Sequence, residues 1–322
     1  MKTILITGGT GFIAKVLFPI LTSGNFHVRT TLRDRAGLSQ LPKGVTGFVT
    51  GNLESITDWK PLLEDVDVVV HLAARVHQMN EKASNRETAY DRMNVEVTRT
   101  LANACSQAWV KRFIFLSSIK AMGEETKTGT AWNESSPCNP QDAYGRSKHN
   151  AERVLNEIGR KTGIAVVILR TPLVYGPGVK ANMARLFKIV DQKWPMPLQS
   201  VENARSLVYI LNLVDAIRVA LEHPKAAGQT YLVSDGEDVS TPELIRRIAV
   251  AIGKPARLFS VPLSLLRLAG RLTGKLETID RLIGSLTVDT AKIQNELDWK
   301  PPYTMEQGLR ETAEWFRKRN RL

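Results

Sequence analysis

The fold is decided by the opening stretch Thr3-Ile4-Leu5-Ile6-Thr7-Gly8-Gly9-Thr10-Gly11-Phe12-Ile13-Ala14. A β-branched apolar run ends in a glycine turn, and apolar residues at helical spacing follow it. Strand, glycine turn and helix are together typical of dinucleotide binding, in which amides at the helix start face a pyrophosphate. Gly9-x-Gly11-x-x-Ala14 fits the form with a small third residue, and Gly8 and Gly11 fit a Gly-x-x-Gly variant. A tight turn that binds no ligand is the alternative.

The second predicted strand, His27–Leu32, has no acid at its tip, and Arg33 follows it directly. A carboxylate at this place binds the adenosine ribose 2′-hydroxyl of NAD, whereas an arginine can bind a 2′-phosphate. We therefore predict that NADP(H) is preferred and that NAD(H) is possible. Asp34 keeps the other reading open, because a one-residue shift in register would return an acid to the tip.

Buried runs alternate with helical patterns along the first two thirds of the chain, which predicts an α/β fold with a Rossmann-like, doubly wound parallel sheet. Further strands are predicted at Val45–Val49, Val66–Leu72, Arg112–Ser117, Ile164–Leu169, Leu207–Ile210 and Gln229–Val233. In such a sheet, ligands bind at the carboxyl ends of the strands. Those ends carry Gly8–Ile13, Arg33, Asn52-Leu53, Leu72-Ala73-Ala74, Ser117-Ser118 and Thr171-Pro172.

Beyond Leu169 the pattern changes to loops and then to helices. We predict a dinucleotide-binding domain of residues 1–175 plus 206–235, and a smaller, mostly helical C-terminal substrate lobe of residues 176–205 plus 236–322. One helix, Leu263–Lys275, carries Arg267, Arg271 and Lys275 on one side and leucines on the other. It could lie on a membrane surface, but we expect it to pack on its own domain with a solvated basic face.

The composition narrows the class of protein. The chain has 322 residues and a formal charge of +12, from 44 Lys and Arg against 32 Asp and Glu. No basic run is interleaved with aromatics, so we expect no nucleic-acid binding. No segment is apolar for long enough to span a membrane, and only two cysteines are present, which fits a reducing cytoplasm. We find no metal-ligand spacing and no hydrolase nucleophile motif.

Tyr144 and Lys148 lie four residues apart where a helix is predicted to begin, so both can project from one face. A neighbouring ammonium favours the phenolate and lowers the pKa of a tyrosine. Such a pair is suited to passing a proton to or from a substrate oxygen. An exposed tyrosine beside a solvated lysine is the alternative that spacing alone leaves open.

With the glycine turn, Ser118 and the Tyr144–Lys148 pair in this order, the chain resembles the extended short-chain dehydrogenase/reductases that act on nucleotide sugars. The resemblance covers essentially the whole chain. The stretches that carry it are His71-Leu72-Ala73-Ala74, Asn94-Val95, Leu169-Arg170, Val174-Tyr175-Gly176-Pro177-Gly178, Arg205–Ile210, Asn212–Ala216, Val288–Lys292 and Leu297–Pro301.

The resemblance implies roles for individual residues. Tyr144 would be the general acid/base, Lys148 would hold the nicotinamide ribose and lower the pKa of Tyr144, and Ser118 would bond the reacting oxygen. Arg205, and less strongly Arg281, would bind the nucleotide pyrophosphate. The remaining cofactor-binding residues would be Gly8, Gly11, Phe12, Ile13, Arg33, Asn52, Leu53, Leu72, Ala73, Ala74, Asn94, Thr171 and Pro172.

Two departures from the family bear on the reaction. UDP-hexose 4-epimerases usually read Arg-x-x-Asn where this chain has Arg170-Thr171-Pro172-Leu173, and they usually carry an acid at the tip of the second strand. Both departures favour a reductase over an epimerase. Within the family, the chain resembles most the 4-ketoreductases of UDP-2-acetamido-2,6-dideoxy-4-ketohexoses. This resemblance implies a cytoplasmic, homodimeric, NAD(P)H-dependent reductase of a 4-keto, UDP-linked deoxyhexosamine in bacterial O-antigen synthesis. The alternatives are a UDP-sugar 4-epimerase with tightly bound NAD, a non-enzymatic NADP(H)-sensing protein, and a reductase of a non-nucleotide ketone or steroid.

Overall fold

The structure, a computed structural model, describes residues 1–76 and 83–320. Its centre is a seven-stranded sheet in the order β3-β2-β1-β4-β5-β6-β9, in which every pair of neighbours is parallel. The strands are β1 Thr3–Thr7, β2 His27–Leu32, β3 Val45–Val49, β4 Val68–His71, β5 Arg112–Ser118, β6 Ala165–Thr171 and β9 Thr230–Leu232. The predicted Rossmann-like fold is confirmed. The predicted strands agree with these to within three residues at each end.

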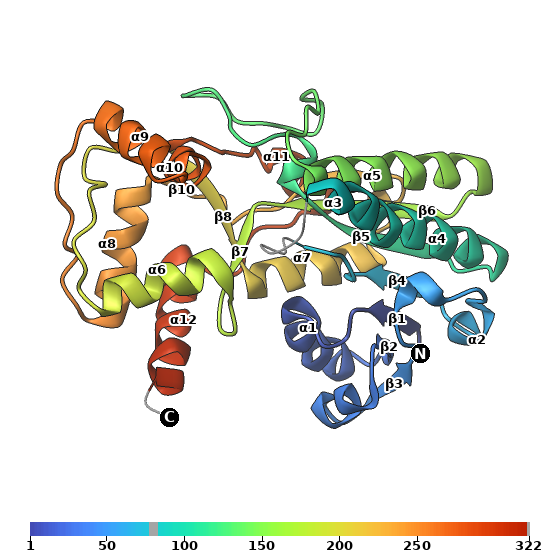
Figure 1. Cartoon of the computed structure of the whole chain (residues 1–322). Coiled ribbons are helices and arrows are strands. Elements are labelled where there is room, and N and C mark those ends of the chain that lie inside the picture. The colour runs from blue at the N-terminus through green and yellow to red at the C-terminus, as the bar shows by residue number, and fades with distance from the viewer. Residues whose placement is uncertain (77–82, 321–322) are drawn as a thin grey trace.

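Helices cover both faces of this sheet (Figure 1). Side chains along β1 alternate between the two faces of the sheet and show which helices cover each face. Ile4 and Ile6 pack in one apolar cluster with helices α1 and α7, whereas Leu5 packs in a second cluster with α4 and α5. The helices of this part are α1 Phe12–Ser23, α2 Lys60–Leu63, α3 Ala83–Tyr90, α4 Val97–Gln107, α5 Ala143–Thr162 and α7 Ile210–Glu222.

A π-helical turn, Asp91–Glu96, joins α3 to α4. The periodicity predicted one continuous helical stripe here, from Met93 to Ala108. Single π-turns inside helices often occur at functional sites, because they shift the side chains that follow by one position. This turn carries Asn94, whose contacts are described below.

The remaining elements form a second, smaller assembly. Strand β8, Arg205–Tyr209, pairs in parallel with β7, Leu173–Tyr175, and antiparallel with β10, Asp238–Val239. Its helices are α6 Ala181–Asp191, α8 Thr241–Ile252, α9 Leu263–Leu272, α10 Leu276–Ile283 and α12 Met305–Asn320, whereas α11 Ala291–Leu297 packs on β9 of the main sheet. The division into two domains at the predicted boundaries stays a prediction. None of the helices in residues 1–76 and 83–320 is both long and apolar enough to cross a bilayer.

Candidate active site

The predicted site residues meet at one edge of the main sheet. In the register of the sheet, Thr7 lies beside His71, His71 beside Phe115, and Ser118 beside Thr171. The segments that leave β1, β4, β5 and β6 therefore start from neighbouring positions. The structure places the glycine turn, Leu72-Ala73-Ala74, Ser118 and Thr171-Pro172 along a common carboxyl edge, which is where this type of sheet binds ligands.

The glycine turn brings backbone amides to this edge. Gly8 has φ +81°, a conformation that favours glycine, and a Cβ atom there would lie 3.1 Å from the Ala73 Cα. Gly11 N–H donates to the Gly8 carbonyl at 2.9 Å, and Gly11 caps α1 without a side-chain acceptor. The amides of the first turn of α1, which begins at Phe12 and Ile13, are therefore available to an anion. Both glycine patterns fit the structure, because a Cβ atom at Gly9 would lie 2.4 Å from Thr30 Oγ1 and Ala14 is buried.

The tips of β2 and β3 carry the residues predicted to select the adenosine part of a cofactor. Arg33 is exposed directly after β2, as expected. The Asp34 carboxylate accepts a hydrogen bond from Gly37 N at 3.1 Å, which caps a short 3₁₀ turn. After β3, Asn52 Oδ1 accepts from Glu54 N at 3.4 Å, and Leu53 is buried. Asp34 is therefore used as a helix cap, whereas the Arg33 guanidinium makes no hydrogen bond or ion pair within residues 1–76 and 83–320.

Ser118, Tyr144 and Lys148 come together where β5 meets the start of α5. A hydrogen bond joins the Ser118 side chain to the half-buried Tyr144 phenol. Lys148, one turn further along α5, is buried, and its Nζ lies 4.1 Å from the centre of the Phe115 ring. The Tyr90 ring stands edge-on to Tyr144, with 6.0 Å between the centroids. The structure therefore brings all three predicted catalytic residues to one place.

Burial sets the proton affinities of this pair. It raises the pKa of Tyr144 to about 12, with the Ser118 hydrogen bond acting in the opposite direction. It lowers the pKa of Lys148 to about 7, against the pull of Glu152. The net shift of the Tyr144 pKa is upward because of burial, and the lowering of this pKa by Lys148 stays a prediction. Desolvation acts on both groups, and it also leaves Lys148 only partly charged near neutral pH.

Replacing Lys148 with methionine should abolish activity but raise the stability of the folded chain at low pH. The pKa of Lys148 is about 7 in the fold, against 10.5 for a lysine in water, so its charge costs stability fully below pH 7 and progressively less up to pH 10.5. The expected gain is on the order of 5 kcal/mol at pH 6, falling toward zero above pH 10. Urea unfolding of both proteins across this range measures it. A gain that is independent of pH would contradict the assignment.

Gly145 lets α5 approach the end of β5 closely. A Cβ atom at Gly145 would lie 2.3 Å from the Lys120 carbonyl oxygen, far inside contact distance. Asp142 caps the helix here by accepting from Gly145 N at 2.6 Å, and its other oxygen bonds Lys120 Nζ at 2.5 Å. The glycine between Tyr144 and Lys148 is therefore what allows the phenol to reach Ser118.

Gly145→Ala should push the start of α5 away from β5. A displacement of about 1 Å costs roughly a hundredfold in rate, and overpacking costs about 1–3 kcal/mol of stability. Gly159→Ala is the matched control on the same helix, because its Cβ would lie 3.2 Å from the Val166 side chain and 3.4 Å from the Ile164 carbonyl, much farther than the 2.3 Å at Gly145. Steady-state kinetics and thermal melts of both variants test this. Equal rates for the two would show that the close approach does not matter.

Asn94 is buried and its polar atoms are bonded within the protein. Its Oδ1 accepts from Arg75 N at 2.8 Å, and its Nδ2 donates to Arg75 O at 3.1 Å and to Ser147 Oγ at 2.9 Å. Ser147 Oγ in turn donates to the Tyr144 carbonyl at 2.8 Å. That Asn94 lines the cofactor stays a prediction. In the structure, Asn94 ties the segment after β4 to the helix that carries Tyr144.

A buried ion pair between Arg170 and Glu152 lies next to the catalytic residues. Arg170 Nη2 lies 2.7 Å and Nε 3.0 Å from the two oxygens of Glu152, and Ser117 Oγ donates to Glu152 Oε1 at 2.5 Å. Both charged residues are buried. Glu152 follows Lys148 by four positions, so the three elements β5, β6 and α5 are joined one turn beyond the lysine. The spacing of Glu152 from Lys148 was the available signal for this pair, but nothing in the sequence identified Arg170 as its partner.

The predicted pyrophosphate arginines lie together in the smaller assembly. Arg205 Nη1 donates to the carbonyls of Arg281 at 2.8 Å and Gly284 at 3.0 Å, at the end of α10. The Arg281 side chain is exposed and lies 3.7 Å from Glu277. Burial lowers the pKa of Arg205, and Glu124 opposes this shift. The two arginines are neighbours, as a shared ligand would require.

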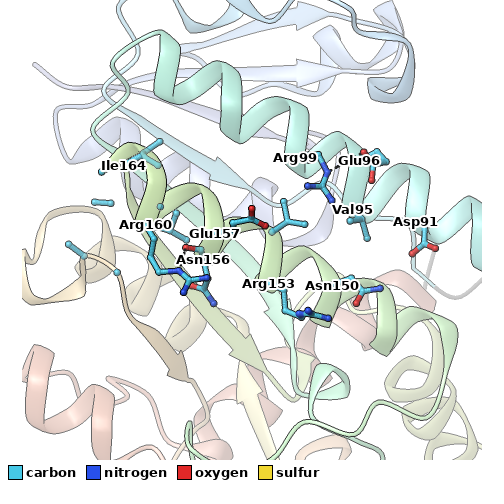
Figure 2. A pocket seen from close by; sticks show the side chains of 17 residues that line it. Asp91, Val95, Glu96, Arg99, Asn150, Arg153, Asn156, Glu157, Arg160 and Ile164 are labelled. Atoms are coloured by element: carbon cyan, nitrogen blue, oxygen red, sulfur yellow. Dashed lines mark hydrogen bonds and ion pairs between the residues drawn. The ribbon is translucent and has the colours of Figure 1, made fainter.

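A large groove lies elsewhere, along the outer surface of α5 and the π-helical turn (Figure 2). Charges of both signs line it, and Figure 2 shows Arg99 and Glu96 from one wall and Arg153 and Glu157 from α5. It contains none of the predicted catalytic or cofactor residues. The groove is therefore distinct from the carboxyl edge of the sheet.

The comparisons with known proteins agree with this geometry. Residues 4–234 match the NAD dependent epimerase/dehydratase family. The chain belongs to this family. It corresponds to the extended short-chain dehydrogenase/reductases that the sequence motifs resemble.

Relatives within the family span nearly the whole chain. The UDP-glucose 4-epimerase of Vibrio cholerae is 42% identical over 321 residues, which cover 99% of this chain and 97% of the relative. An Escherichia coli O157:H7 protein, N-acetyl-alpha-D-glucosaminyl-diphospho-ditrans,octacis-undecaprenol 4-epimerase, is 27% identical over 97% of this chain and 94% of its own. The solved structure of UDP-glucuronic acid 4-epimerase from Bacillus cereus in complex with NAD shares the fold, with a TM-score of 0.79 at 24% identity over 98% and 99% of the two chains.

Proposed function

We propose that this chain is a UDP-sugar 4-epimerase that works with NAD. The observation that carries the proposal is the 42% identity to a UDP-glucose 4-epimerase over 99% of the chain. The cluster of Ser118, Tyr144 and Lys148 supports it, because epimerisation at C4 needs one group that takes and returns a proton. The sequence alone favoured a 4-ketoreductase, and the comparisons favour the epimerase instead.

The residues at the carboxyl edge fit a dinucleotide. A Cβ atom at Gly11 would lie 3.0 Å from the Gly8 carbonyl, so the turn has room for backbone alone, and the first-turn amides of α1 face the same edge. Gly8, Gly11, Phe12 and Ile13 would hold the pyrophosphate. Leu72–Ala74 and Thr171-Pro172 would flank the nicotinamide half. Bound NAD would supply the acceptor and donor for the C4 hydride.

The protein side chains would handle the proton. Tyr144 as phenolate takes the proton of the C4 hydroxyl when the ketone forms, and it returns this proton to the oxygen when the C4–H bond re-forms on the other face. Ser118 holds the same oxygen by a hydrogen bond. An acceptor that reaches Lys148 Nζ favours the ammonium, and the ammonium in turn favours the phenolate of Tyr144.

Arg205 and Arg281 would bind the UDP diphosphate of the substrate. The contact of the Arg205 side chain with the Arg281 backbone supports this, since it brings the two residues to the same end of α10. The likeness to an undecaprenol diphosphate sugar epimerase at 27% identity supports a role in bacterial surface polysaccharide synthesis. The cytoplasm is the compartment in which we place the reaction.

The NADP(H)-dependent 4-ketoreductase is the second candidate. Arg33, exposed after β2, and Leu173, 45% exposed at the start of β7, favour it, because neither residue matches the epimerase pattern described above. The preference for NADP is not supported by the solved relatives, which contain NAD.

Nucleotide released from the purified protein separates the two candidates. The epimerase retains its cofactor through each turnover, so denaturation should release NAD in near-stoichiometric amount, identified by mass spectrometry. UDP should also raise the melting temperature, because a ligand that binds only the folded form stabilises it. Release of NADP, or purification without nucleotide together with NADPH oxidation by a 4-keto UDP-sugar, would favour the reductase.

We also propose that two copies pair through the groove of Figure 2. This surface carries both signs of charge, from Glu96, Arg99, Arg153 and Glu157. A two-fold interface must be complementary to itself, and a surface with both signs can be. Light scattering should give twice the mass of one chain, and Arg153→Glu should shift the protein toward monomer, whereas Arg310→Glu on α12 should not. A monomeric native protein would contradict the pairing.

A further inference from the structure

Helix α9, Leu263–Leu272, exposes its leucines. Leu265, Leu268 and Leu272 are 53%, 50% and 81% exposed. They are three and four positions apart, so they form one stripe along the helix. Phe259, on the segment that leads to α9, is 46% exposed. The helix packs on its own domain through Leu266 and exposes its basic face, as predicted, but three of its leucines stay exposed to solvent.

The stripe points away from the rest of the protein. On α9 only Leu266 and Gly270 are buried, and both lie on the other side of the helix. Gly270 faces α10 so closely that a Cβ atom there would lie 2.9 Å from Ile279 Cγ1. The contact with α10 therefore uses a narrow side of α9, and the leucines remain in solvent. Figure 1 shows α9 and α10 together at one end of the molecule.

Basic side chains surround this stripe. Arg267 lies 3.3 Å from Asp280, and Arg281 lies 3.7 Å from Glu277. Arg257, Arg271 and Lys275 are exposed, and none has a carboxylate within ion-pair distance among residues 1–76 and 83–320. Two of these five basic residues therefore have an acidic partner, and three have none among the described residues. The chain as a whole carries a formal charge of +12.

We propose that α9 docks on an anionic phospholipid surface, with its leucine stripe in the interface and its arginines on the head groups. Exposed leucines flanked by unpaired cations are the arrangement of an interfacial helix. The positive charge around α9 favours an anionic bilayer over a second copy of the protein as the partner of this surface. A second copy of the same face would bring like charges together, whereas an anionic bilayer complements them.

This docking would hold the substrate-binding arginines near the bilayer. Arg205 bonds the carbonyls at the end of α10, and α10 packs on α9. This consequence rests on the proposed function, whereas the docking itself does not, because binding to vesicles can be measured without any substrate.

Flotation of the full chain with vesicles tests the proposal. The protein should float with vesicles that contain phosphatidylglycerol and much less with pure phosphatidylcholine, and added salt should release it. Leu272→Glu should reduce vesicle binding about tenfold or more. Trp109→Glu is the matched control, because Trp109 is 89% exposed and gains the same charge. It directly follows α4, which lies far from α9 in Figure 1.

A second pair of variants tests the cations. Arg271→Gln should weaken binding to the anionic vesicles about fivefold, which is the effect of one basic side chain at such a surface. Lys43→Gln, also exposed and remote in sequence, should leave binding unchanged. Activity in solution should be unaffected by all four substitutions.

The proposal is overturned if the protein stays with the soluble fraction at every lipid composition, or if Leu272→Glu and Trp109→Glu bind equally. It is also overturned if α9 instead mediates self-association, in which case Leu272→Glu would lower the mass in solution without changing vesicle binding.

Discussion

Tyr144→Phe should reduce kcat by about 10²- to 10⁴-fold, the usual contribution of a general acid/base. The substitution removes only the phenolic oxygen, so the ring stays packed and the bound nucleotide should be retained. KM for the UDP-sugar should change little, because the loss concerns proton transfer and not ground-state binding. Stopped assays of sugar interconversion, with nucleotide content measured on the same samples, give both quantities.

Tyr90→Phe is the matched control for this prediction. Tyr90 is buried and its ring lies 6.0 Å from that of Tyr144, so it is the nearest alternative phenol in the described structure. It should keep most of its activity. If Tyr144→Phe retained near-normal rates while Tyr90→Phe lost them, the proton would have to be assigned to Tyr90.

Glu152→Gln should destabilise the fold by about 3–5 kcal/mol, because it leaves the Arg170 guanidinium buried without its counter-charge. Burial opposes the charge of Arg170, but the hydrogen bonds and charge of Glu152 outweigh it and raise the pKa of the arginine. This loss is a large share of the total stability of about 5–15 kcal/mol that such proteins have. Urea unfolding measures it.

The double variant Glu152→Leu/Arg170→Met separates the charge effect from packing. Removing both charges should recover more than half of the lost stability, since a buried pair replaced by apolar side chains is often neutral. A double variant as unstable as Glu152→Gln would show that the shape of the network, including Ser117, matters more than its charge.

The sequence predicted the parts of the site that depend on local pattern. The glycine turn at Gly8 and Gly11 follows a recognisable strand, and parallel strands bring their ends together, so Ser118 and Thr171 could be placed side by side. Tyr144 and Lys148 share a face because the helix repeat requires it.

What could not be predicted depends on burial and on contacts between distant segments. The spacing of Tyr144 and Lys148 gives no information about burial, which raises the pKa of Tyr144 in the fold. Asn94 resembles a cofactor residue in sequence, but its bonds to Arg75 and Ser147 appear only in the fold. The stripe of α9 was expected to be packed because amphipathic helices usually are, and only the exposure of Leu272 shows otherwise.

The most direct test of the proposed function follows deuterium at C4. The protein is mixed with UDP-[4-²H]glucose, without added cofactor, and the products are followed by nuclear magnetic resonance. A 4-epimerase should form UDP-galactose that keeps its deuterium at C4, because the same hydride equivalent leaves and returns within one active site. Absence of interconversion for UDP-glucose and for UDP-N-acetylglucosamine, together with stoichiometric oxidation of NADPH by a 4-keto UDP-sugar, would contradict the epimerase and establish the reductase.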